Sequence, residues 1–406
     1  MKGIAIAALM LGLCATGAGG AAAEISNGVV RIGVLTDLSG PFSAWAGRGS
    51  VVAAQMAVDD FLKQRGPRPY RVEVLSHDFQ LKPDIASAVT RQWIDEGVDA
   101  IVDVPQSGAA LAINGMARGT ATALLFTGAQ HDDLTTRECS PNAVQWTFDS
   151  SALTRTSVYA LARSGRSSWF FVTMNLAGGK SMEDAARAAI ATTGGTAVGE
   201  VRTPPNTPDF SSFLMQAMNS GAKTVGLIQG GADLVNSLKQ AAEFGMAESG
   251  QKLVATFAQL TDIKALGLDL GKGLTFTEAF YWDLDDAKRD FARRFSARND
   301  GAYPTSVQAG AYSGVLHYLK AVDAAGTDHG PTVVARMKER PVDDPLLGPG
   351  VLRPDGRMVH DMYLVEVKKP AESQGPWDLY KVIQTVPGKD AYRPMSTDCP
   401  LVSASR

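Results

Sequence analysis

Runs of apolar residues alternate along this chain with segments in which apolar residues recur every three or four positions. Apolar runs of roughly four to eight residues are typical of strands buried on both faces of a sheet, and the periodic segments are typical of helices with one buried face. Between residues 29 and 126 the two kinds of segment alternate strictly, with predicted strands at 29–35, 71–75, 100–104 and 123–126 and predicted helices at 51–62, 82–96 and 107–118.

The same alternation resumes after Phe148. Because the links are short, right-handed crossovers would arrange each series as a parallel sheet with helices on both faces. The sequence therefore predicts an α/β protein with two doubly wound parallel-sheet lobes. A long helix at 309–324 and strand-like runs at 362–367 and 379–383 follow, and periodicity alone assigns them to neither lobe. The second series comprises predicted strands at 169–172 and 224–228 and predicted helices at 181–191, 210–218 and 234–244.

Composition and charge indicate a folded protein and exclude several classes of function. Of the 406 residues, 45% are hydrophobic and 20% are charged, which is typical of a folded globular chain rather than a disordered one. The formal net charge is −3, and no block of like charges occurs. The sequence therefore predicts neither a nucleic-acid partner nor a polybasic membrane-binding surface.

Residues 1–23 have the pattern of a signal peptide. Lys2 precedes the apolar segment 4–13, and three alanines supply small residues before a cut at residue 24. The alternative is a lipoprotein anchored at Cys14, but Leu13 stands where a small residue is expected, which favours a cleaved and soluble product. No later apolar run is long enough to cross a bilayer, so we expect an exported protein that does not span the membrane.

Cleavage there leaves two cysteines, Cys139 and Cys399, of the three in the chain. In an oxidising compartment two such cysteines can form a disulfide, and the alternative is a pair of isolated buried thiols. Neither has a neighbouring His or a CxxC partner, which disfavours a thiol nucleophile. Because export favours the bond, we predict a Cys139–Cys399 disulfide.

Motifs of catalysis and cofactor binding are missing from the sequence. It contains no GxSxG, P-loop, HExxH or GxGxxG after a strand. The segment 131–133, His-Asp-Asp, is the one local cluster of metal-ligand types, and adjacent residues cannot all reach one ion without special backbone, so a solvated loop is favoured. We expect no metal and no cofactor. The alternative is an exported α/β enzyme with a cryptic hydrolase-type site, built from scattered Ser, His and Asp residues.

Polar residues follow several predicted strands. Gln106 and Ser107 lie between a strand and a helix, with Ser107 placed as the N-cap, and the segment 127–130, Thr-Gly-Ala-Gln, follows the next strand. Parallel strands bring such loops together at their carboxyl edge, where hydroxyls and the free N–H groups of helix starts bind a carboxylate. Trp45, after the first strand, is placed to cover an apolar part of a ligand. The alternative for Ser107 is that it only caps its helix.

Several segments of the chain resemble one family. VVRIGVLTDLSG (29–40), with the following Pro41, is similar to the opening of type I periplasmic binding proteins, the substrate-binding subunits of ABC importers, in the branched-chain amino acid (Leu/Ile/Val-binding) branch. The resemblance implies a Venus-flytrap fold, in which two α/β lobes joined by three crossing segments close on a small solute, and it implies no enzymatic activity. It continues in order through DVPQSGAALAI (103–113), TPDFSSFLMQA (207–217), QAAEFG (240–245), TEAFYWDLDD (277–286) and GPWDLYKVI (375–383).

The resemblance also implies roles for individual residues. Trp45 matches an aromatic residue that lies against the ligand, and Ser107 matches a hydroxyl that holds a ligand carboxylate together with the loop around Gln130. Gln130 replaces the usual Thr or Ser, and Leu176 stands where an aromatic ring is common. Asp262 is a weak match to the acid that binds the ammonium group of amino acids. These departures leave open a branched-chain amino acid, an aromatic acid, an amide or urea as the ligand. The predicted ligand-binding residues are Trp45, Gln106, Ser107, Thr127, Gly128, Ala129, Gln130, Leu176, Gln229 and Asp262.

The expected lobes are discontinuous in sequence. Residues 27–146 plus 281–354 form the first lobe, and residues 147–280 plus 355–406 form the second lobe and the C-terminal tail. Pairing of the run 362–367 within the first-lobe sheet would contradict this division. The resemblance implies a periplasmic monomer that passes an amino acid or other small carboxylate, including aromatic ones, to the permease and ATPase subunits of an importer. A ligand-sensing module without transport is a further alternative.

Overall fold

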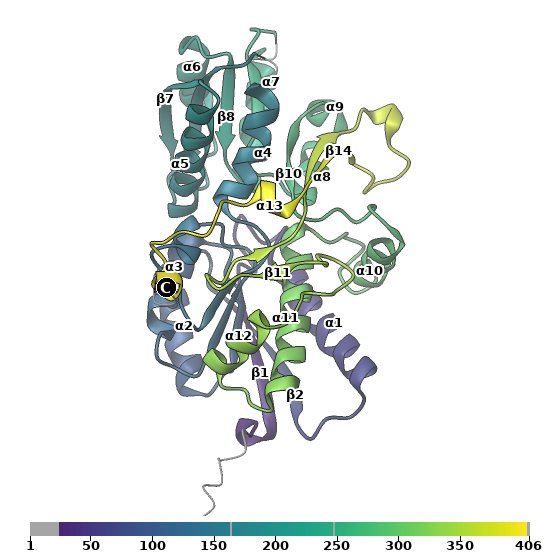
Figure 1. Cartoon of the computed structure of the whole chain (residues 1–406). Coiled ribbons are helices and arrows are strands. Elements are labelled where there is room, and N and C mark those ends of the chain that lie inside the picture. The colour runs from purple at the N-terminus through teal and green to yellow at the C-terminus, as the bar shows by residue number, and fades with distance from the viewer. Residues whose placement is uncertain (1–23, 163–164, 247, 404–406) are drawn as a thin grey trace, which may run out of the picture.

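The computed structural model describes residues 24–162, 165–246 and 248–403 of the chain (Figure 1). The predicted signal peptide, with Cys14, lies outside the described residues. Within the described part of the chain, no helix combines the length and the apolar character needed to cross a membrane. Two parallel sheets, one above the other in Figure 1, form the cores of two lobes, which confirms the predicted α/β class.

The lower sheet in Figure 1 contains five parallel strands in the order β2-β1-β3-β4-β5. Helices α1, α11 and α12 cover one face, and α2 and α3 cover the other. The bounds are β1 (Val29–Thr36), α1 (Gly47–Arg65), β2 (Arg71–Asp78), α2 (Pro83–Asp95), β3 (Ala100–Asp103), α3 (Ser107–Ala117), β4 (Ala123–Phe126), β5 (Ala143–Gln145), α11 (Ser306–Ala325) and α12 (Gly330–Lys338).

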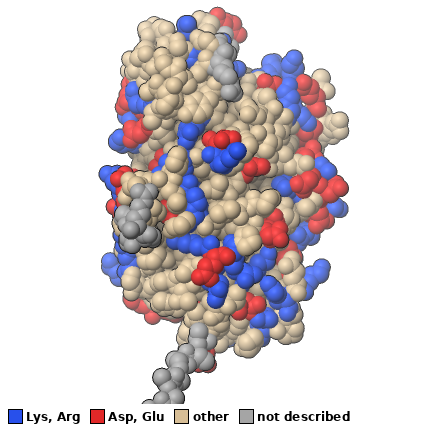
Figure 2. Space-filling model, in the orientation of Figure 1, with Lys and Arg blue, Asp and Glu red and all other residues tan. Residues whose placement is uncertain are grey.

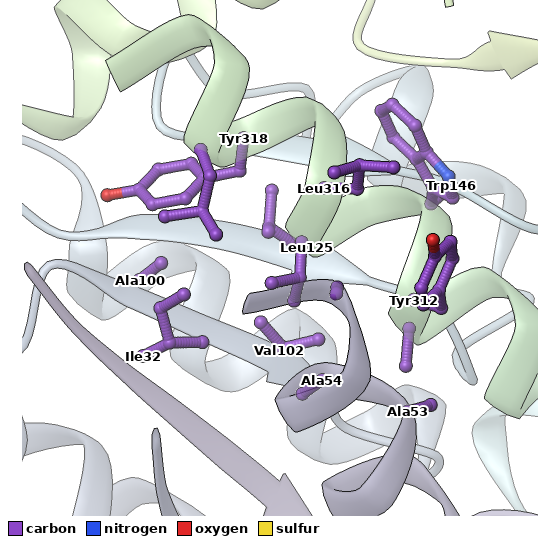
Figure 3. Packing of buried hydrophobic residues seen from close by; sticks show 14 of the residues in the cluster. Ile32, Ala53, Ala54, Ala100, Val102, Leu125, Trp146, Tyr312, Leu316 and Tyr318 are labelled. Atoms are coloured by element: carbon purple, nitrogen blue, oxygen red, sulfur yellow. The ribbon is translucent and has the colours of Figure 1, made fainter. Parts of the chain in front are cut away.

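Alternate residues of these strands point to opposite faces of the sheet. Ile32, Val102 and Leu125 pack with α1 and α11, as Figure 3 shows. Leu35 and Ile101, an odd number of positions away on their strands, pack with α2 and α3 instead. Because both faces are covered, successive residues are buried, which explains why these strands are continuous apolar runs in the sequence.

The upper sheet contains four parallel strands in the order β7-β6-β8-β9. Helices α4 and α5 cover one face, and α6 and α7 cover the other. The sequence pattern does not predict β5, β7 and β9, because β5 and β9 are short and β7 alternates exposed and half-buried residues. The bounds are α4 (Ser150–Ala162), β6 (Ser168–Met174), α5 (Ala177–Thr192), β7 (Thr196–Thr203), α6 (Ser211–Asn219), β8 (Thr224–Ile228), α7 (Ala232–Glu243) and β9 (Lys252–Ala255).

A third, antiparallel sheet lies to the right of the upper lobe in Figure 1. It joins β10 (Thr275–Glu278), β13 (Met362–Val367) and β14 (Tyr380–Val386), so β13 does not pair within the lower sheet. Strands β11 (Val351–Leu352) and β12 (Met358–Val359) form a separate hairpin that packs in the core of the lower lobe. The predicted boundary between residues 354 and 355 falls inside this hairpin.

Charged side chains of both signs lie next to one another over much of the face in Figure 2. Arg294 in α10 lies 2.9 Å from Asp60 of α1, and Arg298, just after α10, lies 2.7 Å from Asp59. Exposed ion pairs of this kind contribute at most about 1 kcal/mol each.

The remaining elements are α10 and several short helices. Their bounds are η1 (Ser26–Gly28), η2 (Asp132–Thr135), α8 (Leu260–Leu266), α9 (Leu268–Gly271), α10 (Asp286–Ser296), η3 (Pro370–Glu372), α13 (Gly388–Ala391) and α14 (Pro400–Ser403).

The chain crosses between the lobes after β5, after β10 and after β12. The first and third crossings are hydrogen-bonded to each other. Arg357 Nη1 donates to the carbonyl oxygen of Phe148 at 2.7 Å, and His360 Nε2 lies 2.7 Å from the carbonyl oxygen of Thr147. Burial lowers the pKa of His360 to about 4, so this ring is neutral at pH 7. The first and third crossings are therefore linked directly where the lobes join.

The C-terminal tail runs back from the upper lobe to the lower lobe. After β14, α13 packs against α4, and Arg393 Nη2 then donates to Asp132 O at 2.9 Å and to Thr135 Oγ1 at 2.8 Å. A disulfide between Cys139 and Cys399, with Cα atoms 5.6 Å apart, anchors the tail to the lower lobe. The predicted disulfide is confirmed.

Removing this disulfide is expected to lower the free energy of unfolding by up to about 4–5 kcal/mol, because the bond closes a long loop in the unfolded chain. The two cysteines are 260 residues apart in sequence. The variant carries Cys139→Ser together with Cys399→Ser, so that no free thiol remains. Guanidinium unfolding of the variant, and of the wild type with and without reductant, measures the difference. A reduced wild type as stable as the oxidised protein would contradict the prediction.

Candidate ligand-binding cavity

A small cavity of about 40 Å³ lies between the two lobes. In the lower sheet the strand order reverses between β1 and β3, and in the upper sheet it reverses between β6 and β8. Loops at the carboxyl ends of such strands form binding crevices in open α/β sheets. The residues that line the cavity are Phe42, Trp45, Pro105, Gln106, Ser107, Gln130, Met174, Leu176, Gly178, Gly179, Met182, Ile228, Gln229, Gly230 and Phe257.

The cavity is uncharged and largely apolar. Among the described residues that line it there is no Asp, Glu, Lys or Arg. The ring centroid of Trp45 lies 4.7 Å from that of Phe42 and 5.5 Å from that of Phe257, and Met174 and Met182 extend this apolar wall. The indole N–H of Trp45 is buried and has no hydrogen-bond partner among the described residues, and indole nitrogen can only donate.

Ser107 is the first residue of α3 rather than its N-cap. Gln106 occupies the cap position, and its side-chain oxygen accepts a hydrogen bond from the N–H of Ala109. The prediction that Ser107 caps the helix is therefore wrong, because the longer Gln106 side chain folds back and satisfies that N–H group. The Ser107 hydroxyl is buried and has no partner within the described part of the chain. Burying a hydroxyl without a partner is costly, so a ligand or a water is expected to satisfy it.

The start of α5 faces the start of α3 across the cavity. A Cβ atom at Gly178 would lie 3.0 Å from Ser107 Oγ and 2.9 Å from Gln130 Nε2, so the α5 backbone lies directly against these side chains of the lower lobe. The first four N–H groups of each helix have no partner within the helix. Two helix N-termini and an unpaired hydroxyl together favour an anionic group such as a carboxylate.

Asp103, buried at the end of β3, connects the loops of the lower lobe. Its carboxylate accepts hydrogen bonds from Thr36 Oγ1 at 2.7 Å and from Thr127 Oγ1 at 3.2 Å, which ties together the ends of β1, β3 and β4. Burial raises the pKa of Asp103 to about 6, although these hydroxyls act in the opposite direction. Asp103 has φ of 83° and Val104 has φ of 54°, conformations that cost energy in residues other than glycine. Asp103 therefore helps to hold a strained turn directly before Gln106.

The structure does not place the predicted residues Thr127, Gly128 and Ala129 on the cavity wall. Thr127 donates to Asp103, the N–H of Gly128 donates to the carbonyl of Asp103 at 3.3 Å, and the carbonyl of Ala129 accepts from Gln145 Nε2 at 3.0 Å. Their polar groups are used inside the lower lobe, where they shape the loop that carries Gln130. The predicted residues that do line the cavity are Trp45, Gln106, Ser107, Gln130, Leu176 and Gln229.

Gln229 and Asp262 are both engaged within the upper lobe. Gln229 Nε2 donates to the carbonyl of Val172 and to Thr203 Oγ1, both at 3.1 Å. Asp262 lies in the first turn of α8, outside the cavity lining, and its carboxylate accepts a hydrogen bond from the N–H of Gln259 at 3.0 Å. Burial raises the pKa of Asp262 to about 7. Asp262 therefore offers no carboxylate at the cavity wall, and Gln229 uses its amide N–H groups within the upper lobe.

The raised pKa of Asp262 predicts how the stability of the folded protein changes with pH. Between pH 4 and 7 the folded protein keeps this proton while the unfolded chain, with a pKa near 3.8, has lost it. Stability contributed by this group therefore falls as pH rises through that interval. In Asp262→Asn the decline in melting temperature between pH 4.5 and 7.5 is expected to be shallower than in the wild type. Parallel curves for the two proteins would contradict the assignment.

Trp45 and Leu176 are the predicted apolar residues of the cavity wall, and the rest of that wall carries no signal in the sequence. Phe42, Met174, Met182 and Phe257 have the pattern of ordinary core residues, and only the folded structure shows that they line the cavity. Gly178 does carry a signal in the sequence, since a glycine at the start of a helix after a strand permits a close backbone approach.

Comparison with known proteins agrees with this geometry. Residues 29–375 match the sequence pattern of the family described as periplasmic binding protein. The chain belongs to this family. A solved periplasmic binding protein from Burkholderia mallei is 40% identical, with a TM-score of 0.88, and the match covers 92% of this chain and 99% of that one. A branched chain amino acid ABC transporter periplasmic ligand-binding protein from Burkholderia xenovorans is also 40% identical, with a TM-score of 0.79 and coverage of 90% and 97%.

Two more distant matches are also binding proteins by name. Leu/Ile/Val-binding protein homolog 3 of Brucella melitensis is 24% identical over 310 residues, which are 76% of this chain and 82% of that protein. A solute binding protein of an ABC transporter from Rhodopseudomonas palustris, solved in complex with 3,4-dihydroxy benzoic acid, shares the fold at 20% identity, with a TM-score of 0.75 and coverage of 89% and 98%. The resemblance seen in the sequence is confirmed, and these relatives are binding proteins rather than enzymes.

Proposed function

We propose that this periplasmic binding protein captures a small carboxylate solute in the interlobe cavity and delivers it to the permease of an ABC importer. The observation that carries the proposal is the buried, unpaired hydroxyl of Ser107, which lies against the start of α5. A hydrogen bond to a charged acceptor contributes about 1.5–3 kcal/mol, and a helix N-terminus typically adds about 0.3–1 kcal/mol for an anion. The lining contains no described acidic side chain that would repel a carboxylate.

Capture is proposed to proceed by closure of two bodies, predicted as residues 27–146 plus 281–354 and residues 147–280 plus 355–406. The hairpin β11–β12 and the tail around Cys399 are kept with the first body, because they are held by the lower lobe. The first body contributes Trp45 and Ser107, and the second contributes Leu176 and the start of α5. Hinge closure around a solute is a common way for two-lobed proteins to bury a ligand. The proposal includes cleavage of the signal peptide, a periplasmic monomer, and the permease and ATPase subunits as partners.

The two alternative functions are less well supported. A hydrolase needs a base beside its nucleophile, and the hydroxyl of Ser107 has no His, Asp, Glu or Lys among the described lining residues. A sensing module would share the fold, so it is distinguished by function. In liposomes that contain the cognate permease and ATPases, a transport subunit with its ligand stimulates ATP hydrolysis, whereas a sensor does not.

The proposal is tested by thermal melting and calorimetric titration against amino acids, aromatic acids, amides and urea. A ligand at a hundred times its Kd stabilises the folded state by about 2.7 kcal/mol, which gives a clear rise in melting temperature. We expect stabilisation by carboxylates. Binding of amides or urea with no binding of any carboxylate would contradict the proposal.

A further inference from the structure

We infer that the solute of this cavity is a monocarboxylate that has an apolar body and lacks an α-amino group. This inference rests on the proposed function, because it assumes that a carboxylate is captured. It goes further by excluding amino acids, which the names of several relatives suggest as ligands.

The first argument is the charge of the cavity wall. A bound amino acid brings an ammonium group, and a buried ammonium is strongly unfavourable unless a carboxylate or several acceptors compensate it. The described lining offers no Asp or Glu from either lobe. A carboxylate alone needs no such partner, because the starts of α3 and α5 supply N–H groups and the favourable end of the helix dipole.

The second argument is that nearby acids are occupied within their own lobes. Asp37 accepts hydrogen bonds from the N–H groups of Gly40 and Phe42, both at 2.8 Å, although Phe42 itself lines the cavity. Asp103 accepts hydrogen bonds from two threonine hydroxyls, and Asp262 accepts one from the N–H of Gln259, the N-cap of α8. Burial raises the pKa of all three carboxyl groups. None of them provides an unpaired counter-charge at the cavity wall.

The third argument is the kind of polar atom left unpaired. Two buried side-chain atoms of the described lining have no partner, Ser107 Oγ and Trp45 Nε1. The indole nitrogen can only donate, and the hydroxyl can donate as well as accept. Gln229 Nε2 donates to the carbonyl of Val172 and to Thr203 Oγ1, and Gln229 Oε1 lies 3.4 Å from Thr203 Oγ1, so this amide is oriented by the upper lobe. Both buried, unpaired atoms of the lining can therefore donate, which suits a ligand group that accepts hydrogen bonds.

The inference is tested with matched pairs of compounds that differ only in the α-amino group. The pairs are phenylacetate and phenylglycine, 3-phenylpropanoate and phenylalanine, and 4-methylpentanoate and leucine. Calorimetric titration of the mature protein, freed of bound solute by unfolding and refolding, measures each Kd. For the pair whose apolar body fits the cavity, the amino-free acid is expected to bind at least about a hundredfold more tightly than the amino acid. The ammonium group of the bound amino acid would be left without a partner.

Two further measurements separate the ways in which the inference can fail. Equal or tighter binding of an amino acid than of its amino-free partner overturns the inference and leaves the proposed carboxylate function intact. The neutral 3-phenylpropanamide tests that function itself, since tight binding of the amide with no binding of any acid overturns both. The Ser107→Ala variant serves as the site control. If the amino-free acid binds in this cavity, the variant weakens its binding, and an unchanged Kd would place the compound elsewhere and overturn the inference.

Discussion

Ser107→Ala is expected to weaken binding of the carboxylate ligand about ten- to a hundredfold, with little change in the melting temperature of the ligand-free protein. The affinity falls because the lost hydroxyl donates to a charged acceptor, a bond that contributes about 1.5–3 kcal/mol. Stability is spared because Gln106, not Ser107, caps α3, and because the hydroxyl has no partner among the described residues. Calorimetric titration and thermal melting of the same preparation measure both quantities.

A matched variant, Gln106→Ala, measures the effect of losing the N-cap of α3 on stability. Gln106→Ala removes the side-chain oxygen that accepts from the N–H of Ala109, and it is expected to cost about 1 kcal/mol of stability. If Ser107→Ala instead lowered the melting temperature as much and left the affinity unchanged, Ser107 would be a structural residue and the proposed site would lose its main contact.

Gly178→Ala is also expected to weaken ligand binding about ten- to a hundredfold, here for a steric reason. The added methyl group would lie 2.9 Å from Gln130 Nε2 and 3.0 Å from Ser107 Oγ, so these side chains must move away before the lobes can approach as closely. Overpacking of this kind typically costs about 1–3 kcal/mol, which corresponds to about a ten- to hundredfold loss of affinity. The separate upper lobe is not destabilised, because alanine is favoured over glycine inside a helix by roughly 0.5–1 kcal/mol.

Gly115→Ala in α3 is the control, since a Cβ atom there meets nothing within 4 Å. Small-angle scattering with and without saturating ligand reports closure, and calorimetry reports affinity. We expect Gly115→Ala to close and bind like the wild type, whereas Gly178→Ala stays partly open. Normal closure and normal affinity in Gly178→Ala would show that the lobes do not need this close approach.

The parts of the fold that depend on local pattern could be predicted from the sequence. Strand β4 matches its predicted bounds, and the strands of the lower sheet are continuous apolar runs because both faces are covered. The third sheet could not be predicted in the same way. It pairs β10 with β13 and β14, which are distant in sequence, and no periodicity reports a pairing between distant segments.

Only part of the candidate site could be predicted from the sequence. The loops of Trp45, Ser107 and Gln130 could be placed at the carboxyl edge, because parallel topology alone brings them there. The cap of α3 could not be assigned correctly, since a serine at a helix start is usually the cap, and only the folded side chain of Gln106 reveals otherwise. Of the apolar wall, Trp45 could be predicted but Phe257 could not, because Phe257 has the same sequence pattern whether it packs in a core or lines a cavity.

The bond between Cys139 and Cys399 also makes most of this chain a closed covalent ring. The ring contains the whole upper sheet, since β6 to β9 lie between the two cysteines. A single backbone cut between residues 140 and 398 therefore opens the ring without dividing the molecule in two. In denaturing electrophoresis, such a nicked protein would migrate as one species until the disulfide is reduced and as two fragments afterwards. In an oxidising compartment, one proteolytic event in the upper lobe thus leaves both halves of the binding cavity attached to each other.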